Sequence, residues 1–322
     1  MTIPTLGRPV KRGIQHAPRS GDDAVRATDS DALYSRNSAI SAGYLPPDPY
    51  TELLLTNPAE PPPKRPVLIN IGTALRSSTI DRLVTDFLSS TPAAQVVSLG
   101  AGSDTRFWRL HSCPSLARYV EVDFEQVATA KAARIATTAL GNAIGDAHAD
   151  GQVLVDAPVY ALIAADLRSD AWHEALFFRL DRSRPTLFLY ECVLAYLSPA
   201  AGNHLISSLA QPFENVHLVC YDMCIAGDGK TDGSPSRFGR VMLENLAMRH
   251  LELPGAREYT TPSAYVARFK SVLATAGAQS LRSVWHSLDS DDRTRLSRVE
   301  GLDEVEELEM LLAHYCIAWA HT

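Results

Sequence analysis

Hydrophobic positions along the chain switch repeatedly between strand-like runs and helix-like spacing. The clearest helix is predicted at residues 73–90, where apolar side chains follow the i, i+3, i+4, i+7, i+8 spacing of one buried face. Short apolar runs are typical of strands buried on both faces. Such runs occur at 96–99, 117–124, 159–167, 186–191 and 216–221, and helices are expected between them at 126–139, from Ser198 onward and around 238–246. This alternation predicts an α/β protein with a doubly wound, Rossmann-like sheet.

The N-terminal part of the chain is predicted to lie outside this alternation. Residues 1–22 are polar and lack periodicity, so we expect a disordered tail. A helix is predicted at 31–42, and the proline-rich segment 58–66 predicts a stiff connector. The predicted division is therefore a tail at 1–22, an N-terminal arm with its connector at 23–66, and a main domain at 67–322 with a helical insertion around 225–260.

Four further elements are predicted near the C-terminus. Residues 262–276 have the pattern of an amphipathic helix that Gly277 ends, and 281–285 predict a strand. An acidic helix is expected at 300–314. Residues 315–319 predict an edge or antiparallel strand that closes the chain.

The composition limits the classes of function. The chain has 322 residues and a formal net charge of −7, which argues against a general nucleic-acid-binding protein. No apolar run approaches membrane-spanning length. Cys220 and Cys224 have no second ligand pair at zinc spacing, so we expect no metal site. Scattered thiols without a signal peptide favour a reducing, cytoplasmic location.

A glycine-containing loop follows the predicted strand 96–99. The stretch V-V-S-L-G-A-G-S-D-T-R at 96–106 places Gly100 and Gly102 where the backbone can turn tightly and approach a ligand. The nucleotide fingerprint G-x-G-x-x-G has Thr105 at its third glycine position, so a pyrophosphate site is only partly indicated. A purely structural turn would also explain this pattern.

Acidic residues stand at the ends of three successive predicted strands. Asp123 lies about 20 residues beyond Gly102, the spacing at which a carboxylate accepts from ribose hydroxyls. Glu121 is two residues earlier on the same face, and a ribose diol would supply donors to both; a solvated strand end is the alternative. Asp166 and Glu191 end the next strands. Such a crevice suits a ligand with hydroxyls, an amino group and a positive centre, as in S-adenosylmethionine, better than a dinucleotide.

Arg76 lies one helical turn before Ile80 on the buried stripe of the 73–90 helix. A guanidinium at that position requires an anionic partner, because its desolvation would otherwise be expensive. The alternative is an arginine whose stem packs at the domain rim while its head reaches water.

Several motifs together resemble the leucine carboxyl methyltransferases. They are L-G-A-G-S-D-T-R-F-W-R-L at 99–110, Y-V-E-V-D-F at 119–124, A-D-L-R at 165–168, E-C-V-L-A-Y-L at 191–197, R-F-G-R-V-M-L-E-N-L at 237–246 and H-Y-C-I-A-W-A at 314–320. The resemblance runs from about residue 31 to residue 320. It implies a class I S-adenosylmethionine-dependent methyltransferase fold with additions, and methyl transfer to the α-carboxylate of the C-terminal leucine of the protein phosphatase 2A catalytic subunit.

The resemblance also implies roles for individual residues. Asp123 would bind the ribose, Asp166 and Leu167 the adenine, and Glu191 the methionine end of the cofactor. Arg76, Gly100 and Gly102 would also hold the cofactor, and Arg76 and Tyr196 would lie near the reacting carboxylate. Ser35 occupies a position where the family leads us to expect a basic residue, which leaves Arg36 as the candidate partner of the methionine carboxylate or the peptide.

The implied partner is the phosphatase catalytic subunit, bound through its C-terminal peptide and its active-site face, with no nucleic acid or membrane and with the enzyme as a monomer. Three alternatives remain open at this point. They are a wybutosine-type transfer-RNA carboxyl methyltransferase, a catalytically inactive phosphatase-binding regulator and a dinucleotide oxidoreductase. The first is disfavoured by the acidic balance and the second by the complete set of strand-end acids.

Overall fold

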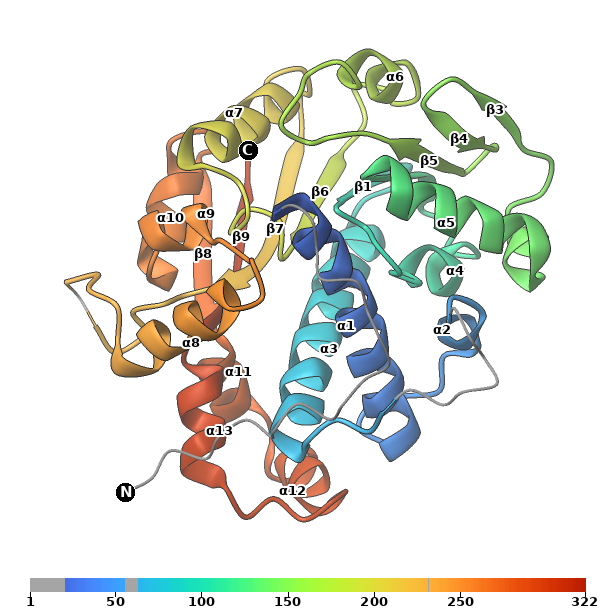
Figure 1. Cartoon of the computed structure of the whole chain (residues 1–322). Helices are drawn as coiled ribbons and strands as arrows, with labels where there is room; N and C mark the ends of the chain where they lie inside the picture. Colours follow the sequence, from blue (N-terminus) through green and yellow to red (C-terminus); the bar gives the residue numbers. More distant parts are fainter. Residues whose placement is uncertain (1–20, 56–62, 231) are drawn as a thin grey trace.

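One mixed sheet forms the centre of the molecule (Figure 1). The computed structural model describes residues 21–55, 63–230 and 232–322. Within these ranges the nine strands lie in the order β3-β4-β5-β2-β1-β6-β7-β9-β8. The strands are β1 (Ala94–Leu99), β2 (Leu116–Asp123), β3 (His148–Asp150), β4 (Val153–Asp156), β5 (Tyr160–Ala164), β6 (Thr186–Glu191), β7 (Val216–Met223), β8 (Thr275–Ser280) and β9 (Tyr315–His321).

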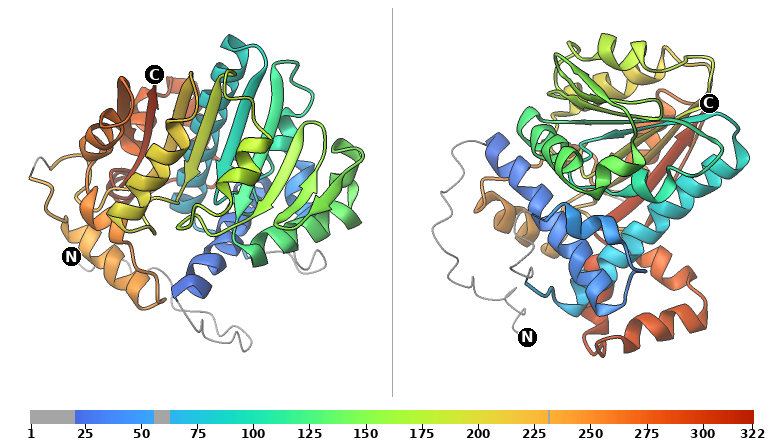
Figure 2. Two further views of the ribbon diagram at one scale, coloured as in Figure 1. Left: turned by 90° about the horizontal axis from the view of Figure 1, so that it is seen from above. Right: turned by 90° about the vertical axis from the view of Figure 1, so that its right-hand side faces the viewer.

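Helices cover both faces of this sheet, as the two views of Figure 2 show. One core cluster joins α3 and α5 to one face, and a second joins α6, α7 and α10 to the other. The helices are α1 (Gly21–Ala42), α2 (Pro49–Leu53), α3 (Val67–Ser90), α4 (Arg106–Leu110), α5 (Glu125–Thr137), α6 (His173–Phe178), α7 (Pro199–Ala210), α8 (Arg237–Ala247), α9 (Pro254–Glu258), α10 (Pro262–Lys270), α11 (Leu281–Ser287), α12 (Ser290–Arg298) and α13 (Val305–Leu312), with a 3-10 turn at Ala139–Ala143. No helix in the described ranges is long and apolar enough to cross a membrane.

The strand order reverses beside β1, and this reversal determines where a ligand can bind. From β1 the chain passes to β2 and β5 on one side, then to β6 and β7 on the other, with all four pairings parallel. The carboxyl ends of β1, β2, β5 and β6 therefore face one crevice at the switch point, which is the ligand position of doubly wound folds. The predicted sheet is confirmed in this part of the chain.

The N-terminal arm is more helical than predicted. Helix α1 begins at Gly21, ten residues before the predicted start at 31, so Asp22 belongs to the helix and not to a tail. Residues 1–20 of the predicted tail, and 58–62 of the predicted connector, lie outside the described residues. Helix α3 begins at Val67, directly after Pro66, six residues before the predicted start. Helices α1 and α3 pack against each other (Figure 1).

The predicted C-terminal elements need correction. The strand predicted at 281–285 is helix α11, whose N-cap Ser280 accepts a hydrogen bond from the backbone N–H of Ser283. The helix predicted at 262–276 ends at Lys270, and Gly277 belongs to strand β8, where it packs against the ring of Trp319. Strand β9 is antiparallel as predicted, but β8 pairs with its outer side, so it is not an edge. Hydrophobic periodicity over seven residues cannot separate helix from strand, which explains the α11 error.

Two other segments differ from prediction. The short hairpin of β3 and β4 was not predicted, because β3 is exposed along its whole length and has no apolar pattern. The helix predicted at 300–314 is limited to α13, and α12 precedes it with Asp289 as its N-cap. Helices α8 and α9 lie within the predicted insertion at 225–260.

Candidate active site

A cavity of about 380 Å³ lies at the carboxyl ends of the central strands. This volume falls within the usual range for pockets that hold small molecules. All the residues predicted for the site line this cavity: Arg36, Arg76, Gly100, Gly102, Asp123, Asp166, Leu167, Glu191 and Tyr196. The structure therefore brings them together, while the role of each remains a prediction.

The loop after β1 requires glycine at both predicted positions. Gly100 and Gly102 have φ angles of 61° and 47°, in the left-handed region that glycine enters without strain. A Cβ on Gly100 would stand 2.7 Å from Cγ2 of Val193. The N–H of Gly102 donates to Oδ2 of Asp123 at 2.6 Å, which ties the loop to the end of β2. The glycines thus serve the backbone geometry of the pocket floor.

Helix α1 closes over this loop through Asp29, a residue that sequence reasoning missed. Its carboxylate accepts from the backbone N–H of Ser103 at 2.6 Å and from the Ser103 hydroxyl at 2.8 Å. A Cβ on Gly102 would overlap the same carboxylate. Two turns further along α1, Arg36 donates to the carbonyl of Ser103 at 3.3 Å and lies 3.6 Å from Asp104. No local pattern indicates that an acid 74 residues away caps this loop.

Asp123 is a buried carboxylate that backbone N–H groups hold. Besides Gly102, the N–H of Phe124 donates to its Oδ1 at 2.7 Å. Burial raises the pKa of Asp123 to about 6, although these two hydrogen bonds lower it. Asp123 has spare acceptor capacity toward the cavity, which suits a neutral donor such as a hydroxyl.

Glu121 does not share that role, and the expectation that both acids face one ligand is wrong. It is fully buried, with Nζ of Lys131 at 2.6 Å and the hydroxyl of Tyr160 donating to it at 2.7 Å. Glu121 stands two residues before Asp123 on β2, so its side chain lies under α5 and not at the end of the strand. Burial raises its pKa to about 7, against the lowering effect of Lys131. Its partner Lys131 comes from α5, so Glu121 has a structural ion pair.

Asp166 and Arg168 connect β5 to the start of α1. Nε of Arg168 donates to Asp166 at 2.8 Å, and its Nη2 donates to Asp22 at 2.9 Å. The hydrogen bonds from Arg168 lower the pKa of Asp166. The guanidinium also lies 5.8 Å from the ring centre of Phe124, the residue after Asp123. This contact brings the N-terminal end of α1 across the predicted adenine position.

Glu191, at the end of β6, lies between two arginines, Arg76 and Arg106. Nε of Arg76 donates to Oε1, and Nη1 of Arg106 donates to Oε2 at 3.0 Å. Burial alone would raise the pKa of Glu191, but Arg76 and Arg106 hold it below its usual range. The guanidinium of Arg76 also lies 4.7 Å from the ring centre of Tyr221. The anionic partner expected for Arg76 is thus Glu191.

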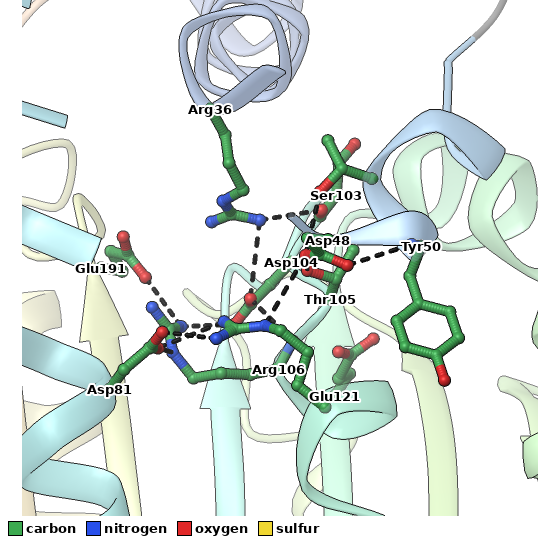
Figure 3. A network of polar contacts seen from close by, with 12 residues as sticks. Arg36, Asp48, Tyr50, Asp81, Ser103, Asp104, Thr105, Arg106, Glu121 and Glu191 are labelled. Atoms are coloured by element: carbon green, nitrogen blue, oxygen red, sulfur yellow. Dashed lines mark hydrogen bonds and ion pairs between the residues drawn. The ribbon is translucent and has the colours of Figure 1, made fainter. Parts of the chain in front are cut away.

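Arg106 is a second residue that sequence reasoning missed. Its side chain is 1% exposed and also pairs with Asp104 and, through Nε at 2.6 Å, with Asp81 of α3 (Figure 3). Burial would raise the pKa of Asp104, but Arg106 holds it well below its usual range. An arginine in the first turn of a helix gives no signal of burial, so only its position after the glycine loop could have drawn attention to it.

Tyr196 lies in the cavity wall, where it packs against a small core cluster that includes Met223 and Leu253. Burial raises the pKa of its hydroxyl, so this group stays protonated at neutral pH and can donate a hydrogen bond.

The polar and charged side chains of this cavity fit a ligand with separated polar groups. Asp123 offers acceptors to a neutral donor, and Glu191 is an ionised acceptor that already meets cations. Arg36 and Arg76 place positive charge on the same cavity. A diol, an ammonium group and a carboxylate can therefore each find a complementary side chain.

Comparison with known proteins agrees with this geometry. The family model described as leucine carboxyl methyltransferase matches residues 31–210. The chain is 38% identical to Leucine carboxyl methyltransferase 1 of Mycosarcoma maydis, over 95% of this chain and 79% of that protein. It is 33% identical to the Bos taurus protein of the same name, over 98% and 95% of the two chains. A crystal structure from Thermobifida fusca, described as a methyltransferase, has a TM-score of 0.53 at 16% identity and covers 85% of this chain and 92% of that one.

The structural likeness establishes the class I S-adenosylmethionine-dependent methyltransferase fold, and the identities establish the family. The predicted fold class and resemblance are both confirmed. The protein belongs to the leucine carboxyl methyltransferase family.

Proposed function

We propose that this protein transfers a methyl group from S-adenosylmethionine to the α-carboxylate of the C-terminal leucine of the protein phosphatase 2A catalytic subunit, as a cytoplasmic monomer. One observation carries the proposal: Asp123, Glu191 and Arg76 come from β2, β6 and α3 and face the same cavity. Two relatives named Leucine carboxyl methyltransferase 1 support the choice of acceptor.

The cofactor assignment follows from the polar and charged side chains of the cavity. Asp123 would accept from the ribose hydroxyls, Asp166 and Leu167 would border the adenine, and Glu191 would accept from the ammonium group. Arg36 lines the cavity and contacts the glycine loop at Ser103 and Asp104, so it would meet the methionine carboxylate. When bound, S-adenosylmethionine supplies an electrophilic methyl group on a sulfonium.

The acceptor needs orientation more than activation. An α-carboxyl has a pKa of about 3.5, so it is ionised at neutral pH and no side chain has to remove a proton. Arg76 would orient this carboxylate, and the buried hydroxyl of Tyr196 would donate to it from the cavity wall. Opposite charges disappear during transfer, so a cavity that α1 shields from water favours the reaction.

A transfer assay tests the proposal. The protein would be incubated with S-adenosylmethionine carrying a labelled methyl group and with the phosphatase catalytic subunit, either intact or lacking its last leucine. We expect base-labile label on the intact subunit only. Equal labelling of the truncated subunit, or none of the intact one under conditions where cofactor binding is measurable, would overturn the proposed acceptor.

A further inference from the structure

Arg106 makes contacts that differ from those of the other arginines near the cavity. Arg36 and Arg76 line the cavity, whereas Arg106 lies beneath it and is 1% exposed. Its three carboxylate partners come from separate parts of the chain: Asp81 from α3, Asp104 from the glycine loop and Glu191 from the end of β6. Arg106 therefore joins the helix, the loop and the strand end that together form one side of the site.

The two arginines that contact Glu191 bind different oxygens of its carboxylate. Arg106 donates to Oε2 from the buried side, and Arg76 donates to Oε1 from the cavity side. The Arg76 side chain is 23% exposed, so it can move into the cavity, whereas Arg106 is held by three carboxylates. The planar guanidinium of arginine offers several donors in fixed directions, which is what simultaneous contact with separate carboxylates requires.

We propose that Arg106 is a positioning residue that holds Oε2 of Glu191 throughout, so that Oε1 exchanges Arg76 for the ammonium group of the cofactor. This inference rests on the proposed function. Arg76 is then released toward the cavity when the cofactor binds, and it becomes available to an acceptor carboxylate only at that stage. The exchange orders the two ligands, cofactor first and acceptor second.

The surroundings of Glu191 support this division. The charged and titratable groups that interact with it are Arg76 of α3, Arg106 of α4, Arg36 of α1, Asp104 of the loop, Cys192 beside it on the chain and Tyr221 of β7. Burial opposes the charge of Glu191, and the guanidinium groups favour it. When Arg76 leaves Oε1, Arg106 is the cation that still touches the carboxylate.

The test measures binding of S-adenosylhomocysteine, which keeps the ammonium group but cannot react, by calorimetry. We expect R106M to weaken binding about tenfold, the usual scale for a lost charge-assisted hydrogen bond. In an E191Q background the same change should weaken binding less than twofold, because Arg106 acts through Glu191. R76M should weaken binding less than R106M, since Arg76 leaves Oε1 in the complex.

A pH profile separates positioning from simple support of the fold. Without Arg106, burial is less opposed and the pKa of Glu191 rises, so binding by R106M should weaken as the pH falls from 8 to 6. The wild-type protein should show a smaller change over that range. R109M is the matched control, because it makes the same change in an arginine that pairs with Asp81 and Asp48 and not with Glu191. It should bind S-adenosylhomocysteine as the wild type does.

Arg106 is buried among three acids, so R106M can fail to fold. R106K then replaces it: lysine keeps the charge but cannot reach Asp104 and Glu191 with a fixed fork, and we expect a smaller loss that again disappears in the E191Q background. Equal losses with and without Glu191, or a larger loss in R76M than in R106M, would overturn the inference. Absence of any binding by the wild-type protein would instead overturn the proposed function.

Discussion

Asp123 and Glu191 end the two strands that flank β1, yet their surroundings are opposite. Backbone N–H groups of Gly102 and Phe124 hold Asp123, and burial raises its pKa to about 6. Two guanidinium groups hold Glu191, and its pKa is lowered. Two acids at equivalent strand ends are therefore prepared for different partners, a neutral donor at Asp123 and a cation at Glu191. A ligand with a diol at one end and an ammonium at the other matches this asymmetry.

The largest effect is expected on the cationic side of the comparison. R76A should lower kcat/KM for methyl transfer about 1,000-fold, because under the proposed function Arg76 orients the acceptor carboxylate. Binding of S-adenosylhomocysteine should change by less than about tenfold. R109A is the control: Arg109 pairs with Asp81 of the same network but does not line the cavity. Transfer by R76A at the rate of R109A would exclude the role of Arg76.

Substitutions of two acids on β2 distinguish a ligand-binding role from a structural role in the core. D123N should weaken S-adenosylhomocysteine about 10- to 100-fold in calorimetry, with little loss of stability. E121Q leaves Lys131 without its buried counter-charge, so it should lower the free energy of unfolding by about 3 kcal/mol while ligand affinity is kept. If E121Q loses affinity and D123N does not, the two residues have been assigned the wrong way round.

The raised pKa of Asp123 predicts a pH-dependent difference in stability. Its pKa is about 6 in the folded protein against 3.8 ordinarily, so the folded state binds the proton more tightly. The stabilisation that protonated Asp123 gives the folded protein is therefore lost as the pH rises from about 4 to about 6. The loss is up to about 3 kcal/mol, and above that range Asp123 causes no further change in stability with pH.

The comparison with D123N isolates this effect from acids of lowered pKa, such as Asp81, which act in the opposite direction. The measurement is urea unfolding of both proteins at several pH values. Relative to D123N, the wild type should become less stable through this window. A constant difference would mean that folding does not raise the pKa of Asp123.

The smallest effect is expected where α1 packs against the glycine loop. G102A and G145A both put a side chain at positive φ, 47° and 78°, but only at Gly102 would the new Cβ meet another group, the carboxylate of Asp29. G102A should therefore lower the free energy of unfolding by about 1 kcal/mol more than G145A. Chemical unfolding of both variants gives the difference. Equal losses would show that Asp29 moves aside freely.

The sequence could identify the site residues that stand in a local pattern of apolar and polar positions. The strand-end acids Asp123, Asp166 and Glu191 were found because each follows a buried apolar run, and parallel strands bring their carboxyl ends together. Arg76 was found because helical periodicity put it on a buried face. These are local patterns, and so was the alternation that predicted the sheet.

Arg106 and Asp29 could not be found in this way. Arg106 is buried because Asp81, Asp104 and Glu191 converge on it, and Asp29 matters because α1 folds back 74 residues along the chain onto Ser103. Such pairings depend on tertiary contacts that no local pattern encodes. Glu121 was misassigned for the same reason, since its partner Lys131 lies on the next helix.

A crystal structure of the protein with S-adenosylhomocysteine tests the central claim most directly. We predict the ribose hydroxyls on Asp123, the ammonium group on Oε1 of Glu191, Arg106 still on Oε2, and the Arg76 guanidinium turned into the cavity. A ligand bound elsewhere, or bound with its ammonium group away from Glu191, would contradict the account.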